Sequence, residues 1–424
     1  MKILVLGSGG REHALVWRLR RSAGVQKVWC APGNGGIAQE AECVALPPDG
    51  MSNPAWLAAM ATRYRPDLTL AGPELPLVSG IADEFAQRGL KLVGPSKPAA
   101  RLEGSKVFAK EFLARNGIPT APLYGIYDSA GDAYSALCAV DWPCVIKADG
   151  LAAGKGVLVA ANPDEATAFI DRLMVTREFG AAGDRVLLEE ALTGQELSYI
   201  VLTDGETVLP LVATRDHKRI YDGNRGPNTG GMGAYSADGM LARELEEQIL
   251  AKIIRPTLEG MAREGHPYRG FLYAGLMLTA DGPQVLEFNC RMGDPETQAI
   301  VVRMDFNLAE ALEATADGRL REIAARWKPG ASACVVMAAA GYPGEPRTGM
   351  TIAGLESAAQ VADAVVFHAG TKRGAQAGEI VVSGGRVLGV TATGPDLRAA
   401  AARAYAAAGK ISFEGAQYRR DIGA

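Results

Sequence analysis

Two segments that lie far apart in this 424-residue chain carry side chains that could handle a nucleotide and a metal ion. In residues 145–157, Lys147 precedes a turn with three glycines, and apolar runs stand on both sides of that turn. This pattern predicts a β-hairpin whose backbone amides close over phosphates while the lysine supplies a fixed positive charge. The glycines are Gly150, Gly154 and Gly156. An ordinary loose hairpin has the same composition, and the spacing is not that of a Walker A loop, so this segment alone leaves both interpretations open.

The second segment, residues 286–297, is a polar cluster on an apolar strand pattern. Glu287 and Asn289 stand two positions apart in it, so their side-chain oxygens should point to the same face. Mg²⁺ prefers oxygen ligands and keeps phosphate oxygens in its shell, and Mn²⁺ takes similar ligands. The two segments together predict a site for ATP with Mg²⁺ or Mn²⁺. Cys290 lies in this cluster, but no histidine is near it in the sequence, which favours a small packed side chain over a nucleophile.

The elements that precede these segments follow the pattern of a parallel α/β sheet. Residues 1–104 alternate short apolar strands with helical stretches. The first turn offers backbone amides at a helix N-terminus, where an anion is favoured. A dinucleotide fingerprint needs Gly or Ala where Glu12 stands, so we expect a smaller phosphorylated ligand. Asn34 and Glu74 lie in loops after the next strands, where a ligand contact and plain turn chemistry are both consistent with the sequence.

Residues 105–327 contain both chemical segments. Within them, residues 120–190 surround the glycine turn, and we expect them to form a mobile lid. An extended run at residues 187–197 could pass between lid and core and hold adenine through backbone groups. The polar, glycine-rich segments 216–219 and 228–233 have no helical or strand periodicity and are predicted to be functional loops. From residue 328 the pattern predicts a small separate α+β domain.

Composition excludes several classes of protein. A formal charge of −4 without a long basic run gives no electrostatic case for binding nucleic acid. No apolar run approaches the roughly 20 residues that span a membrane. The six cysteines contain no CxxC pair, which argues against a disulfide framework or a zinc site. We therefore expect a cytoplasmic enzyme without nucleic-acid or membrane partners.

Ordered motifs along nearly the whole chain resemble one known family. They are GSGGREHA at residues 7–14, GPSKPAARLEGSK at 94–106, the glycine turn, DHKR at 216–219, GPNTGGMGAY at 226–235, and LEFNCR followed by GDPET within 286–297. The chain resembles the phosphoribosylamine–glycine ligases, which are ATP-grasp enzymes of purine biosynthesis. One departure is Met292, where the family commonly has Phe, and an apolar exchange of similar bulk should change packing more than chemistry.

The resemblance implies a fold and a reaction. The fold is α/β, with an N-terminal parallel pre-ATP-grasp domain at residues 1–104 that binds phosphoribosylamine, an ATP-grasp core with its lid at 105–327, and a C-terminal α+β domain at 328–424. The reaction joins glycine to 5-phosphoribosylamine at the expense of ATP and passes through glycyl phosphate. No protein nucleophile is needed, because positioning and electrostatics govern phosphoryl transfer.

The resemblance also implies roles for individual residues. The catalytic set is Lys147, Lys218, Arg291 and Asp294, with Asp294 facing the ammonium of glycine and Arg291 its carboxylate. The ATP contacts are Lys106, Lys147, Gly154, Gly156, Glu189, Ala191 and Glu196. The substrate contacts are Gly9, Gly10, Asn34, Glu74, Asp216, Asn228, Gly230, Gly231, Arg291 and Asp294. The metal ligands are Glu287 and Asn289, whereas Lys155 is expected to be a solvated side chain of the flap.

Two alternatives remain beside this hypothesis. One is an ATP-grasp ligase that joins a different carboxylate and amine, which a substrate panel would distinguish. The other is a nucleotide-sensing protein that binds ATP without turnover, and the intact Lys147, Glu287 and Arg291 argue against it. We expect the chain to act as a monomer.

Overall fold

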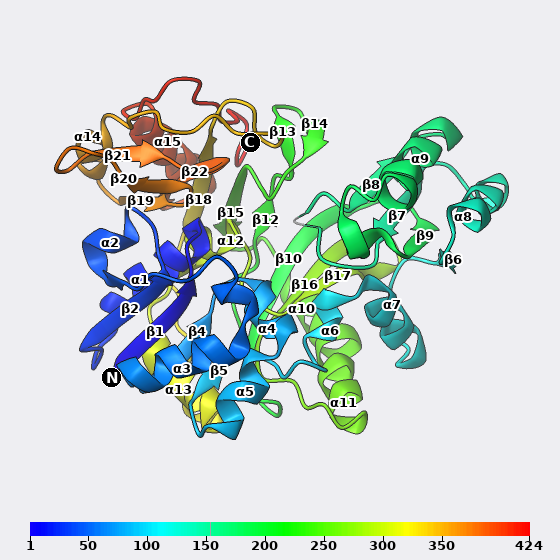
Figure 1. The fold of residues 1–424 in the computed structure, drawn as a ribbon, viewed down its shortest axis with the longest axis horizontal. Helices are drawn as coiled ribbons and strands as arrows, with labels where there is room; N and C mark the ends of the chain where they lie inside the picture. The colour runs from blue at the N-terminus through cyan, green and yellow to red at the C-terminus, as the bar shows by residue number, and fades with distance from the viewer. Residues whose placement is uncertain (153) are drawn as a thin grey trace.

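The computed structural model describes residues 1–152 and 154–424. Figure 1 shows the N-terminal segment in blue, the C-terminal segment in orange and red next to it, and the central segment in green. A further group of strands and helices, residues 123–190, projects away from the rest and is called the arm below. Across the described residues, no helix combines the length and apolar character that a membrane span requires.

The N-terminal segment is a five-stranded sheet in the order β3-β2-β1-β4-β5, and every pairing in it is parallel. Strand β1 is buried after its first residue, because helices cover both faces of a parallel sheet. The strands are β1 Lys2–Gly7, β2 Lys27–Pro32, β3 Glu42–Cys43, β4 Leu68–Ala71 and β5 Leu92–Val93. The helices are α1 Gly10–Arg20, α2 Ile37–Glu40, α3 Pro54–Tyr64, α4 Glu74–Ser79 and α5 Ile81–Gln87. The predicted parallel α/β architecture is confirmed.

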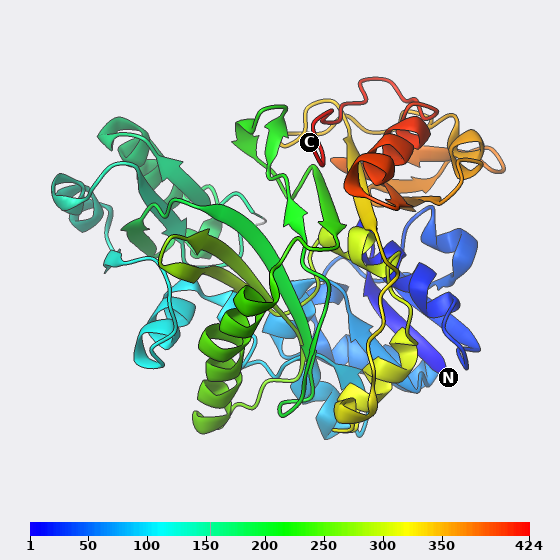
Figure 2. The same cartoon turned by 180° about the vertical axis from the view of Figure 1, so that it is seen from behind.

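The central segment is built on an antiparallel sheet in the order β11-β10-β16-β17. Its strands are β10 Gln195–Thr203, β11 Val208–Pro210, β16 Gly270–Thr279 and β17 Gly282–Asn289. Its helices are α6 Arg101–Gly104, α7 Lys106–Arg115, α10 Arg243–Ile249, α11 Arg255–Arg263, α12 Glu296–Val301 and α13 Leu308–Ala316. Figure 2 shows α11 lying along this sheet, where Leu258 and Met261 join the same buried cluster as Leu272 and Leu276 of β16.

The arm has its own sheet and its own core. The sheet order is β6-β9-β7-β8, with Ile146, Phe169 and Leu188 among the buried residues beneath α8 and α9. The strands are β6 Leu123–Tyr127, β7 Cys144–Ala148, β8 Val157–Ala160 and β9 Val186–Glu190, and the helices are α8 Ala130–Ala136 and α9 Pro163–Ile170. Strands β7 and β8 pair antiparallel, so the predicted hairpin around the glycine turn is confirmed.

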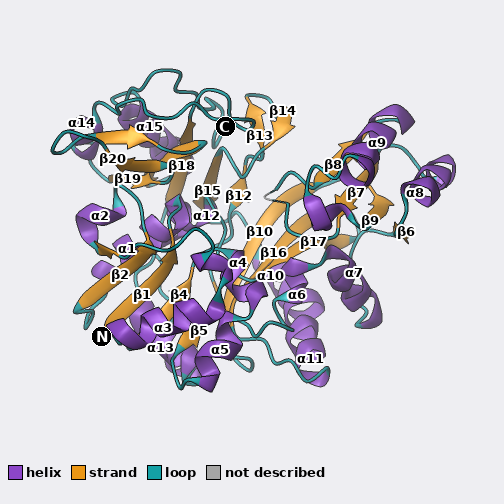
Figure 3. Cartoon of the chain, viewed as in Figure 1, coloured by secondary structure: helices purple, strands orange, loops and turns teal. Residues whose placement is uncertain are grey.

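The C-terminal segment is α+β, as predicted, but its sheet is not confined to residues 328–424. The order is β12-β15-β18-β22-β19, so two strands of the central segment complete it. The strands are β12 Arg215–Asp216, β15 Gly233–Ala237, β18 Ala331–Ala338, β19 Ala364–His368 and β22 Arg386–Gly394. Two hairpins and two helices accompany the sheet. The hairpins are β13 Arg219–Tyr221 with β14 Arg225–Asn228, and β20 Thr371–Arg373 with β21 Ile380–Val382. The helices are α14 Leu355–Ala359 and α15 Leu397–Ala408. Figure 3 shows β18 to β21 directly above the N-terminal segment.

The extension of this sheet has a physical reason. Strand β15 pairs with β18 along its whole length, with Gly233 opposite Val335 and Ala237 opposite Ala331. Without β15, the buried strand β18 would expose an unpaired edge. The prediction of a separate domain missed this pairing because β12 and β15 are short strands that follow polar loops and show no strand periodicity.

Candidate active site

A cavity of about 850 Å³ opens between the arm, the central sheet and the loops that precede β15. Most of the predicted site residues line it. They are Glu74, Lys106, Lys147, Gly154, Gly156, Glu189, Ala191, Glu196, Asp216, Lys218, Asn228, Gly230, Glu287, Asn289, Arg291 and Asp294. The other predicted residues, Gly9, Gly10, Asn34 and Gly231, are not part of the lining.

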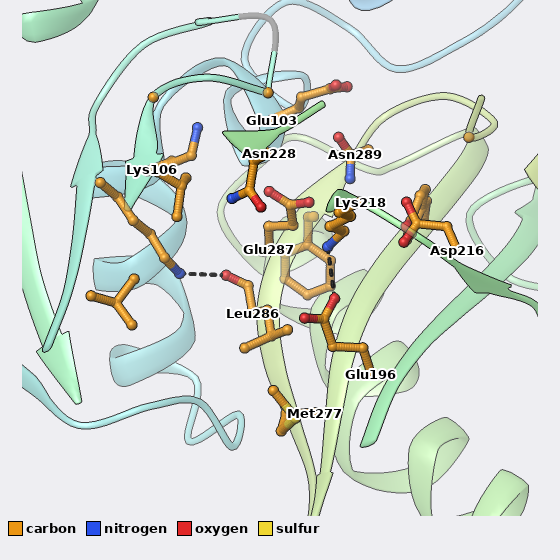
Figure 4. Close-up of a pocket in the computed structure, with 18 of the residues that line it drawn as sticks. Glu103, Lys106, Glu196, Asp216, Lys218, Asn228, Met277, Leu286, Glu287 and Asn289 are labelled. Atoms are coloured by element: carbon orange, nitrogen blue, oxygen red, sulfur yellow. Dashed lines mark hydrogen bonds and ion pairs between the residues drawn. The ribbon is translucent and has the colours of Figure 1, made fainter. Parts of the chain in front are cut away.

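One end of the cavity is an apolar slot. Val145 and Val159 come from the arm, and Met277 and Leu286 come from the central sheet. Figure 4 shows Met277 and Leu286 on the central strands, with Glu196 next to Met277. A slot between two sheets, with backbone groups of residues 190–191 at its side, is suited to a flat heteroaromatic ring.

Next to the slot, two lysines share one carboxylate. Glu189 of β9 is only 2% exposed. It forms ion pairs with Lys147 of β7 and with Lys110 of α7, the latter at 2.7 Å. The Nζ atom of Lys147 also donates to the Leu286 carbonyl at 2.9 Å. Glu189 therefore anchors the cations of this site, since a buried carboxylate is stable when it is paired and hydrogen-bonded.

Glu287 and Asn289 lie in β17 and both line the cavity, as predicted. Figure 4 shows them near Asn228 and Lys218 in the middle of the site. Burial by itself would raise the pKa of Glu287, but the positive charges of Lys218, Lys106 and nearby cations outweigh it and hold the pKa below its usual value. The carboxylate is therefore ionised at neutral pH.

The donor set fits a hard divalent cation that is shared with a ligand. Among the described residues, no group of three or more His, Cys, Asp or Glu side chains could hold a metal ion by itself. Glu287 and Asn289 supply one carboxylate and one amide oxygen, so the remaining ligands must be oxygens of a bound molecule or water. Mg²⁺ behaves in this way at nucleotide sites, where substrate phosphates complete its shell.

Two carboxylates, Glu196 and Asp216, lie close to Lys218 in the cavity. Lys218 forms an ion pair with Glu196 at 2.9 Å, which Figure 4 shows as a dashed line. Burial would lower the pKa of Lys218, but Asp216 and Glu196 together raise it above its usual value. Burial raises the pKa of Asp216 to about 8, with Lys218 opposing the shift and Glu296 adding to it. Glu196 thus neutralises Lys218, and its predicted contact with ATP stays a prediction.

Arg291 is held by two carboxylates from different parts of the chain. Glu103 of α6 lies 2.8 Å from it, and Glu74 of α4 lies 3.2 Å from it. Glu103 also accepts hydrogen bonds from the amide of Cys290 at 2.7 Å and from its thiol at 2.9 Å. Burial raises the pKa of the Cys290 thiol well above its usual value, as expected for a packed side chain rather than a nucleophile.

Asp294 is engaged by charged and polar groups of the protein itself. Its carboxylate lies 3.4 Å from the Arg386 guanidinium and accepts from Gln298 at 2.8 Å and from the Arg11 amide at 3.4 Å. Burial opposes ionisation, but Arg386 and Arg11 keep the pKa of Asp294 below its usual value. Arg291 and Asp294 thus line the same cavity, but each has protein partners of opposite charge.

The N-terminal glycine turn is also occupied by protein groups. The Gly9 amide donates to Glu12 at 2.5 Å, and Arg11 pairs with the same carboxylate at 2.7 Å. The amide nitrogen of Asn34 donates to the Ser8 and His368 carbonyls at 2.8 Å each, while its oxygen accepts from the amides that open α2. The predicted phosphoribosyl contacts of Gly9, Gly10 and Asn34 stay predictions that this geometry does not strengthen.

Comparisons with known proteins cover the whole chain. Three family models match it, described as the phosphoribosylglycinamide synthetase N domain at residues 1–103, the ATP-grasp (A) domain at 104–297 and the C domain at 332–424. The chain belongs to the phosphoribosylglycinamide synthetase family.

Individual relatives agree with that assignment. A phosphoribosylamine–glycine ligase of Ralstonia nicotianae is 49% identical over 424 residues, which are 100% of this chain and 99% of the relative. One of Escherichia coli O6:H1 is 50% identical over 426 residues and covers 100% of this chain and 98% of the relative. The crystal structure of the Thermotoga maritima phosphoribosylamine–glycine ligase superposes with a TM-score of 0.83 at 33% identity, over 99% of this chain and 100% of that one.

More distant structures share the fold alone. The biotin carboxylase domain of the Hydrogenobacter thermophilus 2-oxoglutarate carboxylase has a TM-score of 0.72 at 17% identity, over 98% of this chain and 91% of that one. The ATP-grasp architecture therefore extends beyond the phosphoribosylglycinamide synthetase family.

Sequence reasoning missed several charged residues of this cavity. Lys110 stands four positions after Lys106, on the same face of α7, and that spacing could have found it. Arg11 and Glu103 stand inside the motifs at residues 7–14 and 94–106, but nothing in their spacing pairs them with Asp294 or Arg291. Arg386 comes from the C-terminal segment, and its approach to the cavity depends on the tertiary fold.

Proposed function

We propose that the chain ligates glycine to 5-phosphoribosylamine with ATP and forms glycinamide ribonucleotide, ADP and phosphate in purine biosynthesis. The observation that carries this proposal is one cavity that combines an apolar slot, the lysines at Glu189 and the oxygen pair Glu287 and Asn289. Relatives at about 49% identity over the full chain are named for this reaction.

At the nucleotide end, adenine lies in the apolar slot and the phosphates extend toward β17. Lys147 and Lys106 neutralise phosphate charge, and the amides of the glycine turn close over it. Burial lowers the pKa of Lys106 below its usual value, with Glu287 opposing the shift. A nearby phosphate would favour the charged ammonium and oppose this lowering of the pKa.

The chemistry proceeds in two transfers. A carboxylate oxygen of glycine attacks the γ-phosphorus, and the bond from phosphorus to the ADP oxygen breaks, which gives glycyl phosphate. The amine nitrogen of phosphoribosylamine then attacks the acyl carbon and loses a proton, and phosphate leaves with one former carboxylate oxygen. A divalent cation at Glu287 and Asn289, Mg²⁺ or Mn²⁺, would supply charge neutralisation at the phosphates.

The protein's own part is alignment and exclusion of water. Arg291, which Glu74 and Glu103 fix, faces the carboxylate of glycine, and Asp294, which lines the same cavity, faces its ammonium. The arm acts as a lid that closes over bound ATP and shields the acyl phosphate from water. We also propose domains at residues 1–104, 105–327 and 328–424, and a monomer that works in the cytoplasm.

The test is ADP release by the purified chain with ATP, Mg²⁺ and glycine, with and without phosphoribosylamine generated from ribose 5-phosphate and ammonia. We expect stoichiometric ADP and glycinamide ribonucleotide only when both substrates are present. Release with another acid in place of glycine would identify a sibling ligase. Binding of ATP without release under any combination would identify a nucleotide sensor.

A further inference from the structure

The turn at residues 229–231 lies where three parts of the molecule meet. A Cβ atom built on Gly154, in the glycine turn of the arm, would lie 3.4 Å from the Thr229 carbonyl oxygen. A Cβ atom built on Gly231 would lie 3.3 Å from the Asp294 carbonyl oxygen. On its other side the turn leads into β15, which pairs with the C-terminal strand β18. The turn thus connects the flap and Asp294 to the C-terminal sheet.

Arg386, the first residue of β22, reaches across to this turn. Its Nη1 atom donates to the Gly230 carbonyl at 2.5 Å, the Asp294 carbonyl at 2.6 Å and the Gly231 carbonyl at 3.4 Å. Its Nη2 atom lies 3.4 Å from the Asp294 carboxylate. One guanidinium therefore binds the turn at 230–231 and the turn that carries Asp294 at the same time.

Tyr342 holds the same peptide from its other side. Its hydroxyl oxygen accepts from the Gly230 amide at 2.9 Å, so side chains of the C-terminal segment bind both the amide and the carbonyl of Gly230. A Cβ atom on Gly385 would lie 2.3 Å from the Tyr342 ring, which means that the ring packs directly on the backbone before Arg386. The two side chains form one unit.

We propose that Arg386 and Tyr342 are positioning residues that fix the turn 229–231 and Asp294 in the geometry that ligation requires. This inference rests on the proposed function and gives the C-terminal segment a part in it. The reason is geometric: Nη1 of the planar guanidinium binds carbonyls of both turns while Nη2 reaches the Asp294 carboxylate, and the single nitrogen of a lysine cannot occupy both positions. The charged groups that act on Arg386 are Asp294, Glu296 and Asp216.

The variants for the test are Arg386→Met, Arg386→Lys and Tyr342→Phe. The matched control is Arg403→Met, which removes an arginine of the same segment that pairs with Asp363 at 2.8 Å on the surface. Each variant is assayed for ATP affinity, for kcat and KM in glycine-dependent ADP release, and for hydrogen–deuterium exchange in peptides over residues 226–236. The amides of residues 229–232 all have hydrogen-bond partners, so their exchange reports the order of the turn.

We expect the peptide over residues 226–236 to exchange faster in Arg386→Met than in the wild type. The kcat should fall roughly 10- to 100-fold, because a small misplacement of groups around the substrates has an effect of this size. The affinity for ATP should stay within about twofold. Arg386→Lys should restore neither the slow exchange nor the kcat. Tyr342→Phe should also speed exchange and lower kcat, but by less than Arg386→Met. Arg403→Met should change neither the exchange nor the kcat.

Two results would overturn the proposal. Lost turnover with unchanged exchange would mean that Arg386 acts directly on a substrate, and faster exchange with normal turnover would mean that the turn needs no fixing. If Arg386→Met fails to fold, Tyr342→Phe decides alone, since it keeps the ring. If the wild-type chain releases no ADP, the proposed function fails, whereas the exchange data still report whether the clamp exists.

Discussion

The two ends of the cavity are constructed in different ways. At the nucleotide end, Lys147 and Glu189 stand on β7 and β9, which pair in the sheet of the arm, so the register of these strands fixes their relative positions. Glu287 stands on β17 of the central sheet and lines the same cavity. At the substrate end, groups from the N-terminal, central and C-terminal segments meet through long-range contacts, such as Arg291 with Glu74 and Arg386 with Asp294. Local structure positions one end, and tertiary packing positions the other.

This structural difference predicts that the two ends contribute to different steps, ATP binding at one end and turnover at the other. Residues on neighbouring strands keep their relative positions whenever the sheet is intact, and they suit a part of the ligand that is bound in the same way throughout the reaction. Side chains from three segments come together only when those segments are correctly docked. Changes at the nucleotide end should therefore alter ATP affinity, and changes at the substrate end should alter turnover while ATP affinity is kept.

The largest effect should come from Glu287, where the two ends meet. Glu287→Ala removes the carboxylate of the proposed metal pair, and we expect turnover to fall by about 10³-fold or more. Titration of Mg²⁺ into the ADP-release assay would measure the loss. Glu287→Gln, which keeps the size of the side chain, is the control for packing, and near wild-type turnover in both variants would remove the metal assignment.

Lys147→Met tests the nucleotide end. It removes one of two cations at Glu189 and a phosphate contact, and we expect ATP affinity to fall about 10- to 100-fold with or without glycine. Calorimetric titration with ATP would measure it. Lys155→Met is the matched control, because Lys155 is an exposed lysine of the same turn and should change affinity less than twofold. Equal effects of the two variants would contradict the assignment.

Arg291→Lys tests the substrate end. A lysine cannot keep both ion pairs with Glu74 and Glu103, so we expect kcat/KM for glycine to fall by about tenfold and ATP affinity to stay within twofold. Steady-state kinetics with varied glycine would separate these quantities. Arg115→Lys, at an exposed pair with Glu264, is the control. If Arg291→Lys also lowered the affinity for ATP by about tenfold, the proposed separation of roles between the two ends would be contradicted.

Asp216 should show the smallest effect, in stability rather than turnover. The pKa of Asp216 is raised to about 8 in the folded state, whereas it is near 3.8 in the unfolded chain. The contribution of Asp216 to the free energy of unfolding is therefore complete below pH 3.8 and is lost as the pH rises toward 8. The wild-type chain should therefore lose about 1–2 kcal/mol of stability between pH 6 and pH 8 relative to Asp216→Asn. Thermal unfolding at both pH values measures this difference, and parallel curves for the two proteins would argue against the shift.

The sequence predicted the nucleotide end well because its signals are local. Alternation on a strand brought Glu287 and Asn289 to one face, and apolar runs around glycines predicted the β7–β8 hairpin with Lys147. Each of these patterns depends on residues within one or two strands, where side-chain direction follows from spacing alone.

The substrate end was harder to predict from the sequence, because its contacts join residues that lie far apart in the chain. Arg386 approaches Asp294 only because β18 pairs with β15, a contact between distant parts of the chain. For Asn34, a polar residue in a glycine-rich loop, the predicted ligand contact stays a prediction. In the structure its side chain donates to the His368 carbonyl and accepts from the first amide of α2. Local patterns cannot distinguish a polar group that serves the fold from one that serves a ligand.

The most direct test of the account follows the oxygen atoms of glycine. Glycine labelled with ¹⁸O in its carboxylate would be incubated with the chain, ATP, Mg²⁺ and phosphoribosylamine, and the released phosphate analysed by mass spectrometry. Transfer of the γ-phosphoryl group to the carboxylate predicts one labelled oxygen in each phosphate and one in the amide product. Unlabelled phosphate, formed together with ADP, would contradict the glycyl phosphate intermediate and with it the role assigned to the cavity.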